Sequence, residues 1–260
     1  MLFIISSFNI HAEDDDLKYK IGQMLIVGFE GTRISQESPI NRALLNRQIG
    51  GVVLFDRNLR NSTNSKNIKN PEQLRLLIDH LQSYAKSVDL PPLFISLDYE
   101  GGDVVRLRKE YGFPHIPSAE NMCSNDNKYT AYCANIMSSV MRNSGINTNF
   151  SPVLDVNVNP DSPAIGARGR SFSSDYKKVT ECARIFINEY TKKGIIPVCK
   201  HFPGHGSSDG DTHKMLIDVT NTWKDYELAP YENLASGCGM IMVGHIVNKN
   251  LDNSGMPCRG

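Results

Sequence analysis

Short apolar, β-branched runs alternate along the chain with segments of helical periodicity, and this alternation constrains the fold more than any other feature. The apolar runs have the length of strands and occupy residues 24–29, 51–55, 93–97, 148–154, 195–199 and 240–246. Helical periodicity covers residues 71–88, 131–144, 175–192 and 223–235. Near-continuous apolar strands that alternate with helices indicate parallel strand pairing, with helices covering the sheet.

Polar clusters at the ends of the runs decide between a barrel and a doubly wound sheet. They follow the third to the sixth run and include Asp98, Glu100, Asp155, Lys200 and His245. In a barrel, the carboxyl ends of all strands meet at one mouth, where the chemistry takes place. A doubly wound sheet usually carries a glycine-rich phosphate turn after its first strand, and residues 28–31 do not form one. We therefore predict a TIM-type (β/α)8 barrel that is incomplete, because about six βα units are visible.

Composition excludes several classes of partner. The 28 basic and 28 acidic residues cancel, so no global field favours nucleic acid. No apolar run reaches the roughly 18 residues that a membrane span requires. The 6 cysteines form no CxxC pair, and we expect buried thiols; in an oxidising compartment some of them could pair, with no pairing scheme evident from their spacing.

The N-terminal residues suggest export. Residues 1–12 are largely apolar and end abruptly at an acidic run, which is typical of the end of a signal peptide, although no Lys or Arg precedes them. We expect a signal-peptide remnant over 1–12 and a barrel domain over 13–260, in a periplasmic or extracellular protein. If residues 1–12 are instead an interior strand, a cytoplasmic location is expected.

The segment from Lys200 to His213 concentrates the chemistry of the chain. His201 and His205 are four residues apart, as in a zinc-binding helix. Pro203 and the neighbouring glycines break any helix there, so the spacing does not place both imidazoles on one face. We expect neither a metal nor a cofactor.

Asp211 and His213 are the better candidates for catalysis. They flank one residue, so in an extended loop their side chains project to the same side and the carboxylate can hold the imidazole. A carboxylate partner raises the pKa of a histidine and suits it to proton transfer near neutral pH. Glycines at 204, 206 and 210 would let such a loop close over a substrate. The alternative is a polar surface loop.

Several motifs in order resemble those of family 3 glycoside hydrolases, in the β-N-acetylhexosaminidase branch. The strongest is KHFPGHG from Lys200, followed by Asp211-Thr212-His213. Further matches are GGVVLF at 50–55, SLDYEGG at 96–102 with Val105-Arg106, NFSPVLDV at 149–156, and Ile165-Gly166 with Arg-Ser-Phe at 170–172. The resemblance covers most of the chain.

The resemblance implies a role for each matched residue. It implies that the sugar is bound by Asp98, Arg106, Arg170, Lys200 and His201. It further implies that His213 is the acid/base with Asp211 as its partner, in a retaining enzyme that hydrolyses terminal β-N-acetylglucosaminides of peptidoglycan-type or similar sugars. The expected partner is thus a small carbohydrate or glycan, and the oligomeric state stays open.

One departure from the family pattern bears on activity. The nucleophilic aspartate of the family follows the seventh strand, and no residue of this chain matches it. We therefore expect a barrel domain truncated at its C-terminus, inactive as a hydrolase by itself. The alternatives are a β-glucosidase-type hydrolase of the same family, a catalytically inactive sugar-binding barrel and, ranked last, a metal hydrolase.

Overall fold

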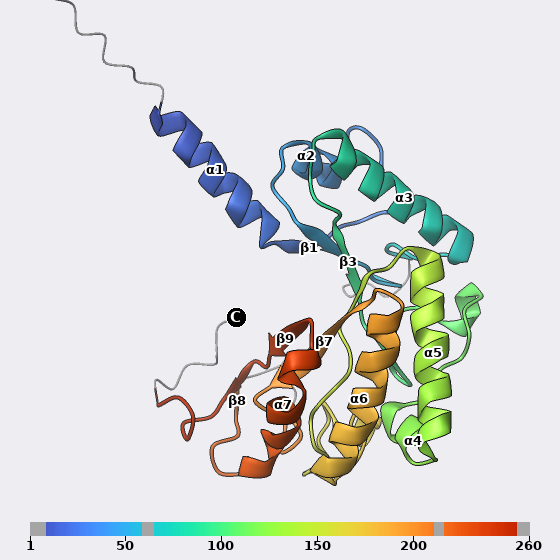
Figure 1. Cartoon of the computed structure of the whole chain (residues 1–260), viewed down its shortest axis with the longest axis vertical. Helices are drawn as coiled ribbons and strands as arrows, with labels where there is room; N and C mark the ends of the chain where they lie inside the picture. Colours follow the sequence, from blue (N-terminus) through green and yellow to red (C-terminus); the bar gives the residue numbers. More distant parts are fainter. Residues whose placement is uncertain (1–8, 59–64, 211–215, 254–260) are drawn as a thin grey trace, which may run out of the picture. The chain divides into compact units, whose positions relative to one another are not determined.

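The predicted apolar runs form short parallel strands in a computed structural model of the chain, which describes residues 9–58, 65–210 and 216–253 (Figure 1). The chain divides between Ser96 and Leu97 into two compact units. Within the described parts, no helix is long and apolar enough to cross a membrane.

The first unit is built from βα units. Its elements are α1 (Asn9–Gln23), β1 (Ile26–Gly28), α2 (Pro39–Leu45), β2 (Gly51–Val53), α3 (Pro71–Ser87) and β3 (Phe94–Leu97), whose last residue begins the second unit. Strand β2 pairs in parallel with both β1 and β3. Residues 9–12, within the predicted signal remnant, belong to α1, and residues 1–8 lie outside the described residues.

Helix α3 confirms the predicted helix over 71–88. The Asn70 side chain accepts a hydrogen bond from the Gln73 amide, and Pro71 occupies the first turn, where its missing amide hydrogen costs nothing. The apolar stripe of the sequence is buried, and it consists of Leu74, Leu77, Ile78 and Leu81. This helix therefore forms from local signals and is held by burial of one face.

Three parallel strands of the second unit carry the polar strand ends. They are β6 (Thr148–Asn149), β7 (Ile196–Phe202) and β9 (Met240–Val243), and β7 pairs with both others. Strand β6 is shorter than the run predicted over 148–154, since Pro152 has no amide hydrogen to donate to the ladder. The rest of that run still lies alongside β7. The Lys200 amide donates to the carbonyl of Pro152, and the Leu154 amide donates to the carbonyl of Lys200.

Two small sheets of the second unit were not predicted. They are the antiparallel pair β4 (Tyr99–Gly101) and β5 (Val104–Val105), and the parallel pair β8 (Ile217–Asp218) and β10 (Ile246–Val247). Apart from Ile246, their residues lie outside the apolar runs from which the strands were predicted, which explains why the sequence did not reveal them.

Helices α5 (Asn127–Ser144) and α6 (Tyr176–Lys192) lie side by side in the second unit, as Figure 1 shows. Asp126 and Asp175 cap their first turns. Helix α6 matches its prediction, and α5 begins four residues before the predicted 131–144. Helix α7 (Ala229–Leu234) is shorter than predicted because a 3-10 turn, η3 (Asp225–Glu227), precedes it. The remaining short helices are α4 (Ala119–Cys123), η1 (Lys109–Tyr111), η2 (Gly166–Arg168) and η4 (Ala235–Gly237).

The expectation of buried thiols is wrong for four of the cysteines. Cys123 on α4 is bonded to Cys182 on α6, and Cys199 on β7 is bonded to Cys238 before β9, with Cα–Cα distances of 6.0 and 5.9 Å. The partners are 59 and 39 residues apart, so their pairing depends on how the elements pack and not on local spacing. Cys133 on α5 is a free, buried thiol, as expected.

Candidate functional site

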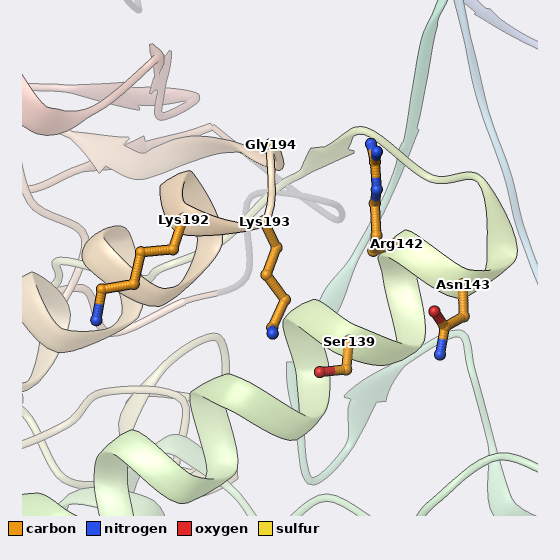
Figure 2. A pocket seen from close by; sticks show the side chains of 6 residues that line it. All are labelled: Ser139, Arg142, Asn143, Lys192, Lys193 and Gly194. Carbon is orange, nitrogen blue, oxygen red and sulfur yellow. The ribbon is translucent and has the colours of Figure 1, made fainter.

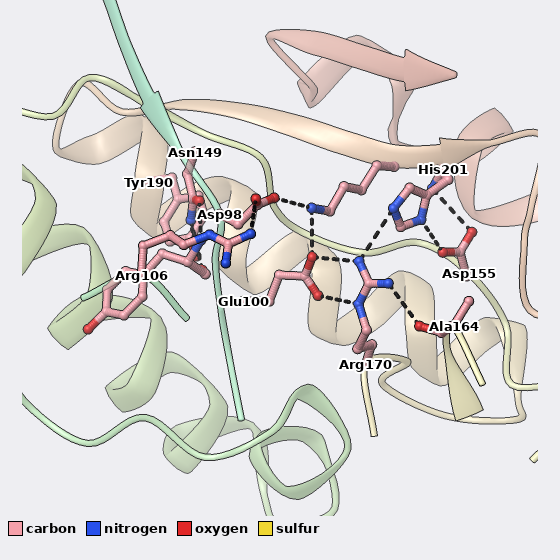
Figure 3. Close-up of polar contacts among 11 residues, drawn as sticks. Asp98, Glu100, Arg106, Asn149, Asp155, Ala164, Arg170, Tyr190 and His201 are labelled. Atoms are coloured by element: carbon pink, nitrogen blue, oxygen red, sulfur yellow. Dashed lines mark hydrogen bonds and ion pairs between the residues drawn. The ribbon is translucent and has the colours of Figure 1, made fainter. Parts of the chain in front are cut away.

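The carboxyl ends of strands in the second unit bring charged side chains together. Asp98 follows β3 directly, Lys200 and His201 lie near the end of β7, and Asp155 follows the run after β6. Because β6 and β7 are parallel, the polar residues after each strand meet at one edge. Figure 3 shows the resulting polar network.

Lys200 lies at the centre of this network, with its side chain only 2% exposed. Its Nζ is 2.9 Å from Asp98 Oδ1 and 2.6 Å from Glu100 Oε1. Asp98 also accepts a 2.9 Å hydrogen bond from Arg106 Nη2. Burial by itself would raise the pKa of Asp98, but the charges of Lys200 and Arg106 outweigh it and hold that pKa well below its usual range.

Glu100 joins Lys200 to Arg170. Arg170 donates from Nε and Nη2 to the two Glu100 oxygens, at 2.8 Å each, and from Nη1 to the carbonyl of Ala164 at 2.8 Å. This planar pairing fixes the guanidinium in orientation as well as in position. Burial opposes the ionised form of Glu100, yet Arg170 and Lys200 lower the pKa of that carboxyl overall.

His201 is held by Asp155. Its Nδ1 is 2.7 Å from Asp155 Oδ2, while Asp155 Oδ1 accepts the backbone amides of His201 and His205 at 3.1 and 2.8 Å. Burial lowers the pKa of His201 more than Asp155 raises it. We infer a neutral imidazole with its proton on Nδ1, which leaves Nε2 as an acceptor facing Arg170 Nη2 at 3.4 Å.

The edges of this network are exposed enough to contact a ligand. The exposed side-chain fraction is 19% for Asp98, 15% for Arg106, 12% for Arg170 and 18% for His201. Ionised donors and acceptors that are already oriented by one another can bind hydroxyl groups with little loss of entropy. The arrangement therefore suits a small polar molecule rich in hydroxyl groups.

The structure brings together the residues that the resemblance assigns to sugar binding, namely Asp98, Arg106, Arg170, Lys200 and His201. Their roles stay predictions. Asp211 and His213 lie outside the described residues. Glu100 and Asp155 also belong to the network, but they were not assigned to the site from the sequence. Both stand in the polar clusters that follow the apolar runs, and this position was the signal that could have identified them.

His205, the second histidine of the possible metal pair, makes its own contacts. Its ring centroid lies 5.7 Å from that of His201, and its Nδ1 is 2.9 Å from Ser208 Oγ. Neither residue lies on a helix. Among the described residues, no group of three His, Cys, Asp or Glu side chains is placed to hold a metal ion.

A cavity of about 520 Å³ lies at the other end of β7 and is shown in Figure 2. It is lined by Ser139, Arg142, Asn143, Lys192, Lys193 and Gly194. The basic residues stand near the C-terminal ends of α5 and α6, where cations offset the negative end of the helix dipole. Lys192 also pairs with Glu189 at 2.6 Å. These structural roles account for the charges that line the cavity.

Comparison with proteins of known sequence identifies relatives that match most of the chain. Beta-hexosaminidase A from Pseudoalteromonas piscicida is 34% identical over 215 residues, which make up 79% of this chain and 34% of that protein. A beta-hexosaminidase from Alkalilimnicola ehrlichii is 32% identical over 239 residues, which make up 88% of this chain and 63% of that protein. The chain thus spans less than two thirds of the length of these relatives.

Solved structures give the same result. A glycoside hydrolase family 3 β-N-acetylglucosaminidase from Paenibacillus sp. superposes with a TM-score of 0.82 at 31% identity, covering 93% of this chain and 44% of that one. NagZ from Neisseria gonorrhoeae, solved in complex with N-trifluoroacetyl-D-glucosamine, has a TM-score of 0.76 at 26% identity, covering 90% of this chain and 66% of that one. This likeness confirms the predicted TIM-type (β/α)8 class, of which the chain holds an incomplete barrel.

The family model confirms the resemblance seen in the sequence motifs. The model described as the glycosyl hydrolase family 3 N-terminal domain matches residues 16–260. The motifs, the polar network at the strand ends, the relatives and the solved structures are all consistent with this match. The chain belongs to glycosyl hydrolase family 3, as its N-terminal domain.

Proposed function

We propose that the chain is the sugar-binding part of a retaining β-N-acetylglucosaminidase that acts on peptidoglycan-type or similar glycans. The observation that carries the proposal is the network of Asp98, Glu100, Arg170, Lys200 and His201 at the strand ends. Its support comes from relatives named beta-hexosaminidase and from a structural neighbour that binds an N-acylated glucosamine. Asp98 and His201 contact sugar hydroxyls in this proposal, while the buried Lys200 and Glu100 hold them in place.

The catalytic step assigned to this family needs two groups besides the sugar site. A carboxylate attacks the anomeric carbon while an acid protonates the departing oxygen, and water then resolves the glycosyl-enzyme. In our proposal His213 is that acid and then the base, oriented by Asp211. Since no residue of the chain matches the family nucleophile, we propose that the 260-residue chain binds sugar without hydrolysing it.

Asp98→Asn is expected to weaken binding of N-acetylglucosamine to the chain about tenfold. The substitution removes the negative charge of the carboxylate that faces Lys200 and that accepts hydrogen bonds from sugar hydroxyls in this proposal. Titration calorimetry with N-acetylglucosamine and glucose measures the affinities. Asp103→Asn, at an exposed carboxylate on the same hairpin, is the matched control and leaves the affinity unchanged. Equal affinity for wild type and Asp98→Asn, or no binding by the wild type, would contradict the proposed sugar site.

His213→Ala is expected to slow substrates with poor leaving groups about a hundredfold more than activated aryl glycosides, because only poor leaving groups need a proton. The comparison requires a form of the enzyme that contains the nucleophile and uses 4-nitrophenyl N-acetyl-β-glucosaminide against a natural disaccharide. An equal loss on both substrates would argue against the acid role.

We further propose that the protein is exported to an oxidising compartment. The two cysteine pairs in the second unit support this, since such bonds persist outside the cytosol. The apolar residues 1–12 are consistent with a signal remnant. Mass spectrometry of the protein from its source, after alkylation without reduction, would test both points through the modified thiols and the mature N-terminus.

A further inference from the structure

Glu227 is a buried carboxyl group that the proposed chemistry does not use. It is the last residue of η3 and is fully buried. Its Oε1 accepts the backbone amide of Lys224 at 3.0 Å. Within the described parts of the chain it forms no ion pair, which distinguishes it from Asp98, Glu100 and Asp155. A buried carboxyl group with no cation beside it is costly to ionise, so it needs an explanation.

The neighbours of Glu227 belong to the loop that follows His201. Gly204 has a φ of +121°, and a Cβ there would lie 2.9 Å from Glu227 Cβ. The loop backbone therefore passes directly over Glu227 at a point where only glycine fits. Trp223 fixes the same stretch by donating from Nε1 to the carbonyl of Pro203 at 3.2 Å. The hydroxyl and amide of Ser207 also approach the Glu227 carboxyl group.

The loop is held on a second side by the residues that orient His201. The His205 amide donates to Asp155 Oδ1 at 2.8 Å, and the Asn159 amide donates to the carbonyl of Gly206 at 3.0 Å. The loop of residues 203–208 thus lies between Asp155–Asn159 and the Trp223–Glu227 segment. The loop therefore connects Glu227 to Asp155, through the contact at Gly204 and the amide of His205.

The charge on Glu227 depends on pH in the neutral range. Burial raises the pKa of Glu227 to about 7, with the Lys224 amide and Ser207 opposing the shift and the charge of Asp155 adding to it. Tyr231, whose pKa burial raises, also senses the charge of Glu227. Ionisation would therefore place a second negative charge near Asp155, beneath this loop.

We propose that Glu227 is a positioning residue of the sugar site: its neutral form holds the loop of residues 203–208 against Asp155, and its ionisation loosens that loop. Glu227 does not touch the sugar and acts through the Asp155–His201 pair. This inference rests on the proposed function for the site, but the behaviour of the loop can be measured without any sugar.

Amide hydrogen exchange tests the loop directly. The amides of Gly204, His205 and Ser208 are all hydrogen-bonded in the structure, and their protection factors are followed from pH 5 to 9 after correction for the intrinsic rate. In the wild type we expect protection to fall about tenfold with a midpoint near pH 7. Glu227→Gln, which is neutral and of the same shape, is expected to keep the protection of the wild type at low pH and to show no midpoint.

Two further variants complete the test. Glu232→Gln, at an exposed position on α7, should leave the midpoint in place. Glu227→Ala should lose loop protection at every pH while the amides of α5 and α6 stay protected; if it fails to fold, Glu227→Gln decides alone. The same pH profile in wild type and Glu227→Gln would overturn the proposal, as would a loop that stays protected in a folded Glu227→Ala.

Sugar affinity separates this proposal from the proposed function. If the chain binds N-acetylglucosamine, the wild type should lose affinity severalfold between pH 6 and 8, and Glu227→Gln should not; parallel profiles would overturn the positioning role. If the wild type binds no sugar at any pH, the proposed function fails. The exchange data then still decide whether Glu227 holds the loop.

Discussion

Replacing Glu100 by alanine is expected to lower the free energy of unfolding of the second unit by about 3–5 kcal/mol. Glu100 accepts both hydrogen bonds of Arg170 and contacts Lys200 at 2.6 Å, and the Glu100 and Lys200 side chains are each 2% exposed. Removing the carboxylate takes away the ion-pair partner that the buried Arg170 and Lys200 share, while Asp98 still contacts Lys200. Because an unpaired charge in a protein interior is costly, the effect should far exceed that of an ordinary surface substitution.

Urea titration followed by the fluorescence of Trp223 measures this effect, since the only tryptophan of the chain lies in the second unit. The matched control is Glu181→Ala, which removes an exposed carboxylate paired with Lys178 at 3.0 Å and should cost less than about 1 kcal/mol. If Glu100→Ala were as stable as this control, the network would not be the buried charge cluster described above.

Replacing both Cys123 and Cys182 by alanine is expected to cost about 4 kcal/mol of stability, through the chain entropy of the unfolded state. The bond closes a loop of 59 residues and joins α4 to α6, on either side of α5 along the chain. A reductant opens Cys199–Cys238 in both proteins and Cys123–Cys182 only in the wild type, so the difference between the two proteins should vanish under reducing conditions.

Cys133→Ala is the control for this pair, because Cys133 is a buried free thiol on α5 and its loss removes no cross-link. We expect a change of about 1 kcal/mol for it, independent of reductant. Complete alkylation of Cys123 and Cys182 in the native, unreduced protein would show that the bond does not form, and the predicted difference would vanish.

The sequence alone was sufficient to place strands β1, β2, β3, β6, β7 and β9 and the long helices α3, α5 and α6, whereas α1, a helix of 15 residues, was not predicted. The apolar stripe of α3 and the caps of α5 and α6 are local features, and local features depend only on residues a few positions apart. The short strands β4, β5, β8 and β10 were missed because, apart from Ile246, their residues lie outside the apolar runs of the sequence.

The candidate site was predictable only in part. The polar residues after each apolar run pointed to the correct edge of the sheet, because parallel strands bring their carboxyl ends together. The family motifs then singled out Asp98, Lys200 and His201. Neither signal indicated that Glu100 would pair with Arg170, 70 residues away, or that Asp155 would hold His201.

What the sequence by itself determined is the alternation of the main strands with helices α3, α5 and α6, the family, and the residues that stand at the strand ends. The tertiary structure decided which of these residues become partners: Lys200 meets Asp98 across 102 positions, Cys199 meets Cys238, and Glu227 lies under the loop after His201. The physical reason is that periodicity and capping are short-range properties of the chain. Ion pairing, cross-linking and burial of a charge depend instead on which elements pack together, and that is settled only when the whole unit folds.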